Sequence, residues 1–264
     1  MDIPLLLLKT VLLRPYVFFF LAVSLFAASR FLGWKRTCWM FGITWVTAFV
    51  CEFLSTRIGF PFGDYFYTAS TVGEELYISN IPFMDSLSFA FLLYASYCLA
   101  LLFVLPLQNT SQRLEKHLVL RKVLSWPVIG LTCLLFMFID IVIDPVALQG
   151  SRWFLGQIYG YPDPGVYFGV PLANFIGWFI VGLIAMCGYR VVDRRQGILP
   201  RLPETIPVRE VLLGCGLYYG VLLFNLLVTF WIGEALMGIA GCFIYVPITV
   251  LVWLKLAGKL PLSG

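Results

Sequence analysis

The chain of 264 residues carries little charge. Only 12% of its residues are Asp, Glu, Lys or Arg, whereas 61% are hydrophobic and 17% are aromatic. A soluble domain of ordinary composition carries about a quarter charged residues, so these proportions exclude a soluble globular protein and a disordered chain. The mean hydropathy of +0.92 is typical of a protein embedded in a lipid bilayer. The sequence therefore predicts an integral membrane protein.

Histidine and paired cysteines are also scarce. His117 is the only histidine, which excludes a histidine-rich di-iron site and a zinc site of the HExxH type. The seven cysteines are odd in number, lie inside apolar runs and form no CxxC pair, so a disulfide framework or a metal cluster has no support. Gly214, Gly216 and Gly220 lack the spacing of a dinucleotide-binding loop and indicate close helix packing. We expect neither a metal nor a cofactor.

Seven runs without charged residues are long enough, together with their flanks, to cross a bilayer as helices. We expect one all-α, polytopic transmembrane domain over residues 1–264. Its spans are predicted near residues 15–33, 37–56, 83–107, 123–143, 168–189, 211–232 and 235–255. The run Ile3–Leu13, broken by Lys9, is too short to cross and is expected to lie at the membrane interface.

Lys and Arg are distributed unequally between the two sides of the predicted bundle. Fourteen of the 18 lie in the first, third and fifth loops and the C-terminal segment, and four lie on the other side. By the positive-inside rule, the C-terminus is cytoplasmic and the N-terminus lies outside, in the inner membrane if the cell is bacterial. The net charge of +4 therefore belongs to cytoplasmic loops, and no nucleic-acid partner is expected.

Ten of the 14 acidic residues belong to the opposite, outer side, and four of them lie in the ends of predicted spans. Glu52 ends the second span and Asp85 opens the third, while Asp140 and Asp144 share one helical face near the end of the fourth. Each acid alone could equally be a helix cap or stop. Four together favour a functional cavity, because burying ionisable groups in a membrane is costly. Two neighbouring carboxyl groups on one face repel each other when both are ionised, which favours the retention of a proton by one of them.

The outer loops are rich in aromatic residues and glycine. Their rings either form an interfacial belt or line a slot for a flat polyene, where their faces would stabilise a carbocation. Arg57 and Arg152 are the nearest cations expected for the acidic residues, and one of them would keep a carboxylate ionised. Glu74 and Glu75 are expected to face water, and so is Glu234.

Several of these segments together resemble a known family. They are Glu52, the stretch GFPFGDYFY at 59–67, residues 140–147 with the sequence DIVIDPVA, Trp153, and YFGVPLANFIGW at 167–178. The set resembles the carotenoid biosynthesis membrane proteins, which include bisanhydrobacterioruberin hydratase and γ-carotene 1′-hydroxylase. The resemblance runs from about the second span to the fifth.

The resemblance implies addition of water across the terminal 1′,2′ double bond of an acyclic carotenoid, giving a tertiary alcohol without any cofactor. A protonated carboxyl group would deliver the proton, and a carboxylate-held water would capture the resulting cation. The implied partners are a lipid-soluble polyene or isoprenoid, the membrane and other carotenoid enzymes. Which acid donates the proton stays open at this stage.

The candidate residues follow from this reaction. The catalytic candidates are Glu52, Asp64, Asp85, Asp140 and Asp144. The substrate-binding candidates are Tyr65, Tyr67, Trp153, Tyr167, Asn174, Trp178, Arg57 and Arg152, with Asn174 orienting a neighbouring carboxyl group. We expect the five acids and Asn174 to converge in one cavity near the outer leaflet.

Two other classes of function use the same acidic cavity. A proton-coupled transporter would use the acids as a relay, but such folds often show inverted repeats, and no self-similar halves are visible here. A non-catalytic isoprenoid-binding protein would need no acids at all. A retinal-binding sensor is disfavoured, because Lys255 comes only at the end of the last predicted span.

The unequal distribution of cations predicts the orientation of the loops. Cysteines or reporter domains placed in the third loop (residues 108–122) or the fifth loop (residues 190–210) are expected to be protected from external, membrane-impermeant reagents. Labelling of either loop from outside the cell would contradict this topology.

Overall fold

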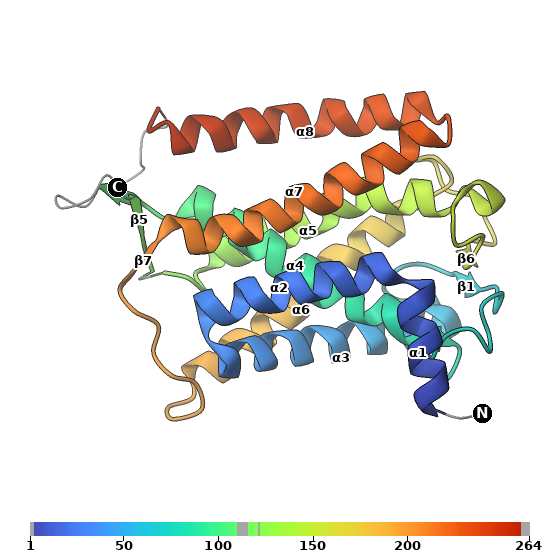
Figure 1. Ribbon diagram of the computed structural model, residues 1–264, viewed down its shortest axis with the longest axis horizontal. Coiled ribbons are helices and arrows are strands. Elements are labelled where there is room, and N and C mark those ends of the chain that lie inside the picture. The colour runs from blue at the N-terminus through green and yellow to red at the C-terminus, as the bar shows by residue number, and fades with distance from the viewer. Residues whose placement is uncertain (1–2, 110–115, 121, 260–264) are drawn as a thin grey trace.

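The computed structural model describes residues 3–109, 116–120 and 122–259. It is mostly helical, and within these residues seven helices are long and apolar enough to cross a membrane. They are α2 (Pro15–Leu32), α3 (Trp34–Ile58), α4 (Phe83–Val104), α5 (Trp126–Ala147), α6 (Leu172–Arg194), α7 (Val208–Trp231) and α8 (Ala235–Leu256). These helices extend along the same direction in Figure 1. The fold is therefore compatible with the predicted polytopic membrane protein.

The N-terminal segment forms a separate short helix, α1 (Ile3–Leu13). Arg14 separates it from α2, which begins at Pro15, and proline is favourable at the first position of a helix. The Lys9 ammonium group donates to the Gly73 carbonyl at 3.2 Å and pairs with Glu74 at 3.3 Å. These contacts connect α1 to the loop between α3 and α4.

Most helix ends differ from the predicted spans by a few residues, and the differences are largest at α5 and α6. The span predicted to end at residue 143 continues as α5 to Ala147, with Pro145 inside the helix. Pro145 lies in the last turn and has no N–H group to donate to the Ile141 carbonyl, so one backbone hydrogen bond of the helix is absent there. The span predicted from residue 168 begins as α6 only after Pro171, whose extended backbone occupies the N-cap position.

Short strands lie at both ends of the bundle, which an all-α prediction does not include. At one end β1 (Phe66–Tyr67) pairs antiparallel with β6 (Tyr159–Gly160), and β2 (Tyr77–Ile78) pairs with β3 (Ile81–Pro82). At the other end β5 (Lys116–Val119) lies between β4 (Leu107–Asn109) and β7 (Thr205–Pro207). A 3₁₀ turn, η1 (Gly150–Arg152), follows α5. The first of these pairings joins the loop after α3 to the loop after α5 (Figure 1).

Helix α4 forms the centre of the bundle. Some 78% of the residues in its apolar stretch are buried, against 22% for α8. It packs against α3, α5 and α7, whereas α8 contacts the bundle mainly through α7. The exposed face of α8 carries large apolar side chains such as Phe243, Val246 and Trp253, which suit contact with lipid chains.

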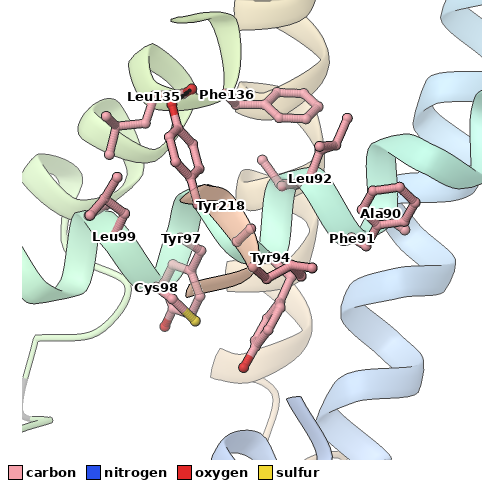
Figure 2. Packing of buried hydrophobic residues seen from close by; sticks show 14 of the residues in the cluster. Ala90, Phe91, Leu92, Tyr94, Tyr97, Cys98, Leu99, Leu135, Phe136 and Tyr218 are labelled. Atoms are coloured by element: carbon pink, nitrogen blue, oxygen red, sulfur yellow. Dashed lines mark hydrogen bonds between the residues drawn. The ribbon is translucent and has the colours of Figure 1, made fainter. Parts of the chain in front are cut away.

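Figure 2 shows part of this core, where side chains of α4 lie beside those of α5 and α7. The Tyr218 hydroxyl donates to the Leu135 carbonyl at 2.8 Å and hydrogen-bonds to the Tyr245 hydroxyl at 2.9 Å. The Tyr97 hydroxyl donates to the Val123 carbonyl at 3.1 Å. A buried hydroxyl group needs a hydrogen-bond partner, so these bonds allow the tyrosine side chains to be buried in an apolar core.

Close packing of α4 against α7 requires a glycine at position 214. A Cβ atom there would lie 2.3 Å from Cys98 Sγ and 2.7 Å from Cys98 Cβ, which is far inside contact distance. At Gly216, two residues on, a Cβ atom would meet nothing within 4 Å. Small residues allow helices to approach closely in membranes, and Gly214 has this role here.

We expect Gly214→Ala to destabilise the protein by about 1–3 kcal/mol, because α7 must move away from α4. The matched control Gly216→Ala adds the same methyl group on the same helix without a clash. It should be neutral or stabilise by up to about 1 kcal/mol, since alanine favours the helix. Thermal unfolding in detergent micelles measures both effects, and equal melting temperatures would contradict the packing argument.

Candidate functional site

One end of the bundle contains a cavity of about 150 Å³. We call this end, where Glu52, Asp85 and Asp144 lie, the acidic end. The polar residues that line the cavity are Arg14, Glu52, Tyr65, Tyr67, Asp85, Ser88, Asp144, Trp153, Tyr159, Tyr161, Asn174 and Asn225. Apolar and aromatic residues complete the wall: Tyr16, Val17, Phe20, Phe62, Met84, Phe89, Phe91, Leu92, Ile143, Ala147, Trp178, Val221 and Phe224. Such a mainly apolar cavity with a few convergent polar groups is the usual form of a small-molecule site.

Asp140 and Asp144 of α5 form an acid pair on one side of the cavity. The Asn174 side-chain amide donates to both carboxyl groups, at 2.7 Å to Asp140 and 2.6 Å to Asp144. Asp144 also accepts hydrogen bonds from Tyr159 at 2.9 Å and Tyr161 at 3.2 Å. Asp144 borders the cavity, while Asp140 lies behind it, fully buried.

The acid pair has no neighbouring cation in the part of the chain that the structure describes. Neither carboxyl group forms an ion pair there, and Asp140 Oδ1 makes no hydrogen bond. Two buried carboxylates without a counter-charge repel each other strongly, and this repulsion is relieved when they share a proton. The geometry therefore favours an acid pair that holds one proton.

Glu52 of α3 lies on a different wall of the cavity and is 3% exposed. One carboxyl oxygen accepts a hydrogen bond from the Ser86 hydroxyl of α4. The other accepts a bond from the Tyr67 hydroxyl at 3.1 Å. These two donors fix the orientation of the carboxyl group at the cavity surface.

Arg14, Glu75 and Asp85 form a second charged group, the arginine cluster. Arg14 is 3% exposed and pairs with Glu75 at 2.7 Å and with Asp85. Burial acts to lower the pKa of Arg14, but the adjacent charges of Asp85, Tyr16 and Glu75 raise it above its ordinary value. The guanidinium group thus stays charged beside two carboxylates.

The arginine cluster corrects two expectations. Glu75 was predicted to face water, but it is 1% exposed, because Arg14 and the Thr71 hydroxyl at 2.5 Å compensate its charge. Arg57 and Arg152 were predicted to serve the acids, but neither lines the cavity. Their partners lie elsewhere on the protein.

The predicted cations are both exposed. The Arg57 guanidinium stacks over the Phe53 ring at 3.4 Å and donates to the Ser79 hydroxyl at 3.1 Å. Arg152 pairs with Glu234 at 2.6 Å, so Glu234 is not simply solvated. The cation at the cavity is Arg14, in the break between α1 and α2.

Most of the other predicted site residues do meet at the cavity. The structure brings together Glu52, Asp85, Asp144, Tyr65, Tyr67, Trp153, Asn174 and Trp178. Trp178 stacks on Phe89 with ring centroids 4.2 Å apart, and both rings face the cavity. This pair contributes aromatic wall to the cavity that Glu52 and Asp144 also line.

Besides Arg57, Arg152 and Asp140, which lies behind the cavity, two more predicted residues do not line it. Asp64 is exposed, and its carboxyl group lies against Gly59, where a Cβ atom would be only 2.5 Å away. Tyr167 packs against Phe168 and Phe175 with ring centroids 4.9 and 5.8 Å apart. Both residues therefore belong to the loop structure around the site.

Sequence reasoning overlooked Arg14, Tyr159 and Tyr161 as cavity residues. The positive-inside rule only counts Lys and Arg on each side of the membrane, so it does not distinguish Arg14 from any other cation in a loop. Tyr159 and Tyr161 belong to a Tyr-Gly-Tyr stretch whose rings reach Asp144 only because β6 pairs with β1. Within the described residues, no group of three or more His, Cys, Asp or Glu side chains is arranged to hold a metal ion.

We expect Arg14→Gln to destabilise the protein by about 3–5 kcal/mol, because it leaves the carboxylates of Glu75 and Asp85 buried without their cation. The control Lys9→Gln breaks the exposed pair with Glu74 and should cost no more than about 1 kcal/mol. Chemical or thermal unfolding in micelles measures the loss of stability in both variants. A similar small loss in both variants would show that the arginine cluster does not depend on its charge.

Comparison with known proteins agrees with these features. A family model for carotenoid biosynthesis proteins matches residues 11–250. The chain is 28% identical over 190 residues to a bisanhydrobacterioruberin hydratase from Haloarcula japonica, covering 72% of this chain and 56% of that relative. The chain thus spans little more than half the length of this relative.

No solved structure matches the chain. The seven apolar helices and the family match together indicate an integral membrane protein. The chain belongs to the carotenoid biosynthesis protein family.

Proposed function

We propose that this protein adds water across a terminal carbon–carbon double bond of an acyclic carotenoid and so forms a tertiary alcohol. The observation that carries the proposal is the acid pair beside an aromatic cavity. Its two carboxyl groups share the Asn174 amide and have no ion-pair partner among the described residues. The reaction is of the kind named for the Haloarcula relative. An alkene has no charge to bind, so its hydration needs a strong, dry acid and a held water molecule.

The acid pair supplies the proton in this mechanism. Asp144 borders the cavity and Asp140 lies behind it, so the shared proton is presented to the substrate from Asp144. Transfer to the less substituted alkene carbon forms a C–H bond and leaves a tertiary cation on the other carbon. The developing negative charge on the pair is stabilised by hydrogen bonds from Asn174, Tyr159 and Tyr161.

Glu52 holds the water in this mechanism. Its carboxyl group is oriented by Ser86 and Tyr67, and it faces the same cavity as Asp144. A carboxylate in this position accepts a proton from water as the water oxygen attacks the cation. The arginine cluster next to it keeps Asp85 charged, which adds negative potential on the side where the cation forms.

Aromatic rings stabilise the cation before it is captured. The rings of Trp178, Phe89 and Tyr65 line the same cavity as Asp144 and Glu52. Cation–π attraction is worth about 2 kcal/mol when the site is shielded from water. The same rings exclude bulk water, which would otherwise weaken the acid.

The proposal includes an orientation in the membrane. The acidic end faces outwards, the N-terminus lies outside and the C-terminus lies in the cytoplasm, in the inner membrane if the cell is bacterial, as the distribution of Lys and Arg indicates. A lipid-dissolved substrate and product would pass between this protein and other carotenoid enzymes in the same membrane.

The direct test is product analysis. Carotenoids are extracted from a host that makes an acyclic carotenoid, with and without this chain, and analysed by mass spectrometry. The expected product is heavier by one water molecule, and chelators should not reduce its amount, since the mechanism uses carboxyl groups alone. If the extracts are identical, a transport or binding function of the same cavity becomes the better explanation.

We expect Asp140→Asn and Asp144→Asn to insert normally, and at least one to lose about a hundredfold or more in rate. Asparagine keeps the size and much of the hydrogen bonding but cannot carry the transferable proton. Asp163→Asn, in the exposed loop before α6, is the control and should keep full activity. Wild-type rates in both pair variants would rule out the acid pair as the proton donor.

A further inference from the structure

This inference rests on the proposed hydration and concerns how the catalytic groups are reset. Hydration consumes one water molecule and no net proton. After each cycle the acid pair has lost a proton and Glu52 has gained one. The enzyme therefore needs a route by which the proton returns from Glu52 to the acid pair.

The two carboxyl sites do not contact each other directly, but tyrosine hydroxyls reach both. Tyr67 donates to Glu52 at 3.1 Å, and Tyr159 and Tyr161 donate to Asp144 at 2.9 and 3.2 Å. The pairing of β1 with β6 places Tyr67 directly opposite Tyr159. The two loops are thus held in register, with a tyrosine at each carboxyl site.

Tyr65 lies between these tyrosines. Its ring centroid is 5.4 Å from that of Tyr67, 6.3 Å from Tyr161 and 6.4 Å from Tyr159. The Tyr65 ring thus adjoins the tyrosine at Glu52 on one side and the two tyrosines at Asp144 on the other. All four rings line the cavity.

These hydroxyl groups are suited to relay a proton without being ionised. Burial, followed by the nearby charge of Glu52, raises the pKa of Tyr65 and Tyr67 well above the ordinary tyrosine value. A tyrosine with so high a pKa keeps its proton and passes one on only as it accepts another.

We propose that Tyr67 and Tyr65, together with Tyr161, form a proton-return path that carries the proton from Glu52 back to Asp144 after each hydration. The Glu52 carboxyl group donates its proton to the Tyr67 oxygen while Tyr67 donates its own to Tyr65. Tyr65 passes a proton, directly or through a cavity water, to Tyr161, whose own proton moves to Asp144. One O–H bond breaks and one forms at each hydroxyl, so the path ends with Glu52 ionised and the acid pair protonated.

Tyr65→Phe is the sharpest test, because the donors to Glu52 and Asp144 belong to Tyr67, Tyr159 and Tyr161 and stay in place when the Tyr65 hydroxyl is removed. Membranes with a known amount of protein are supplied with excess acyclic carotenoid, and hydrated product is followed over time. We expect one product per protein at the wild-type rate, then a steady rate lower by roughly tenfold or more. The control is Tyr219→Phe. Tyr219 lies outside the cavity and its buried hydroxyl has no hydrogen-bond partner among the described residues, so this variant should match the wild type.

Two results would overturn the path. An unchanged steady rate in Tyr65→Phe would mean that the acid pair recovers its proton by another route. An equal loss in the first and the later turnovers would give Tyr65 a structural role only. If the wild type forms no hydrated product in the same assay, the proposed function itself fails, and this outcome is distinct from the other two.

Discussion

The structure of the acidic end depends on the cost of placing carboxyl groups in an apolar bundle. A charge in such surroundings needs an opposite charge, several hydrogen-bond donors or a proton of its own. The protein uses all three. Arg14 compensates Glu75 and Asp85, hydroxyl groups hold Glu52, and Asp140 and Asp144 share an amide between them. These contacts bring together the ends of α3, α4, α5 and α6. The interactions that form the polar site therefore also hold this end of the bundle together.

The three solutions differ in what they leave available for chemistry. A carboxylate paired with arginine is held in its ionised form and is a poor proton donor. A carboxyl pair without a cation is most stable with a proton between its members, and the proton can leave when a positive charge forms nearby. In the proposed mechanism the cavity therefore presents a fixed negative charge on one wall and a proton on another. This separation of roles would be lost if Arg14 lay beside Asp144 instead of beside Asp85.

Much of this organisation could be predicted from residue spacing and hydropathy. Seven apolar runs correspond to the seven long helices, and the four-residue spacing of Asp140 and Asp144 placed them correctly on one helical face. Arg14 could not be found in this way, because its partners lie more than 60 residues along the chain. Asp64 was expected in the cavity together with the other outer acids, but exposure alternates along residues 64–67, so Asp64 is exposed while Tyr65 and Tyr67 are half-buried. The two-residue strands β1 and β6 are too short to leave a pattern in the sequence, and their pairing brings Tyr159 and Tyr161 to Asp144.

A tertiary cation in such a cavity has two competing fates, and geometry decides between them. Loss of a proton from a neighbouring carbon returns an alkene, whereas attack by water gives the alcohol. A base that reaches the carbon skeleton favours the first outcome, and a base that reaches only a water molecule favours the second. In the proposed mechanism Glu52 is held back by Ser86 and Tyr67, which leaves its free lone pairs for water at the cavity surface. The hydrogen bonds that fix this carboxyl group would therefore also select hydration over isomerisation.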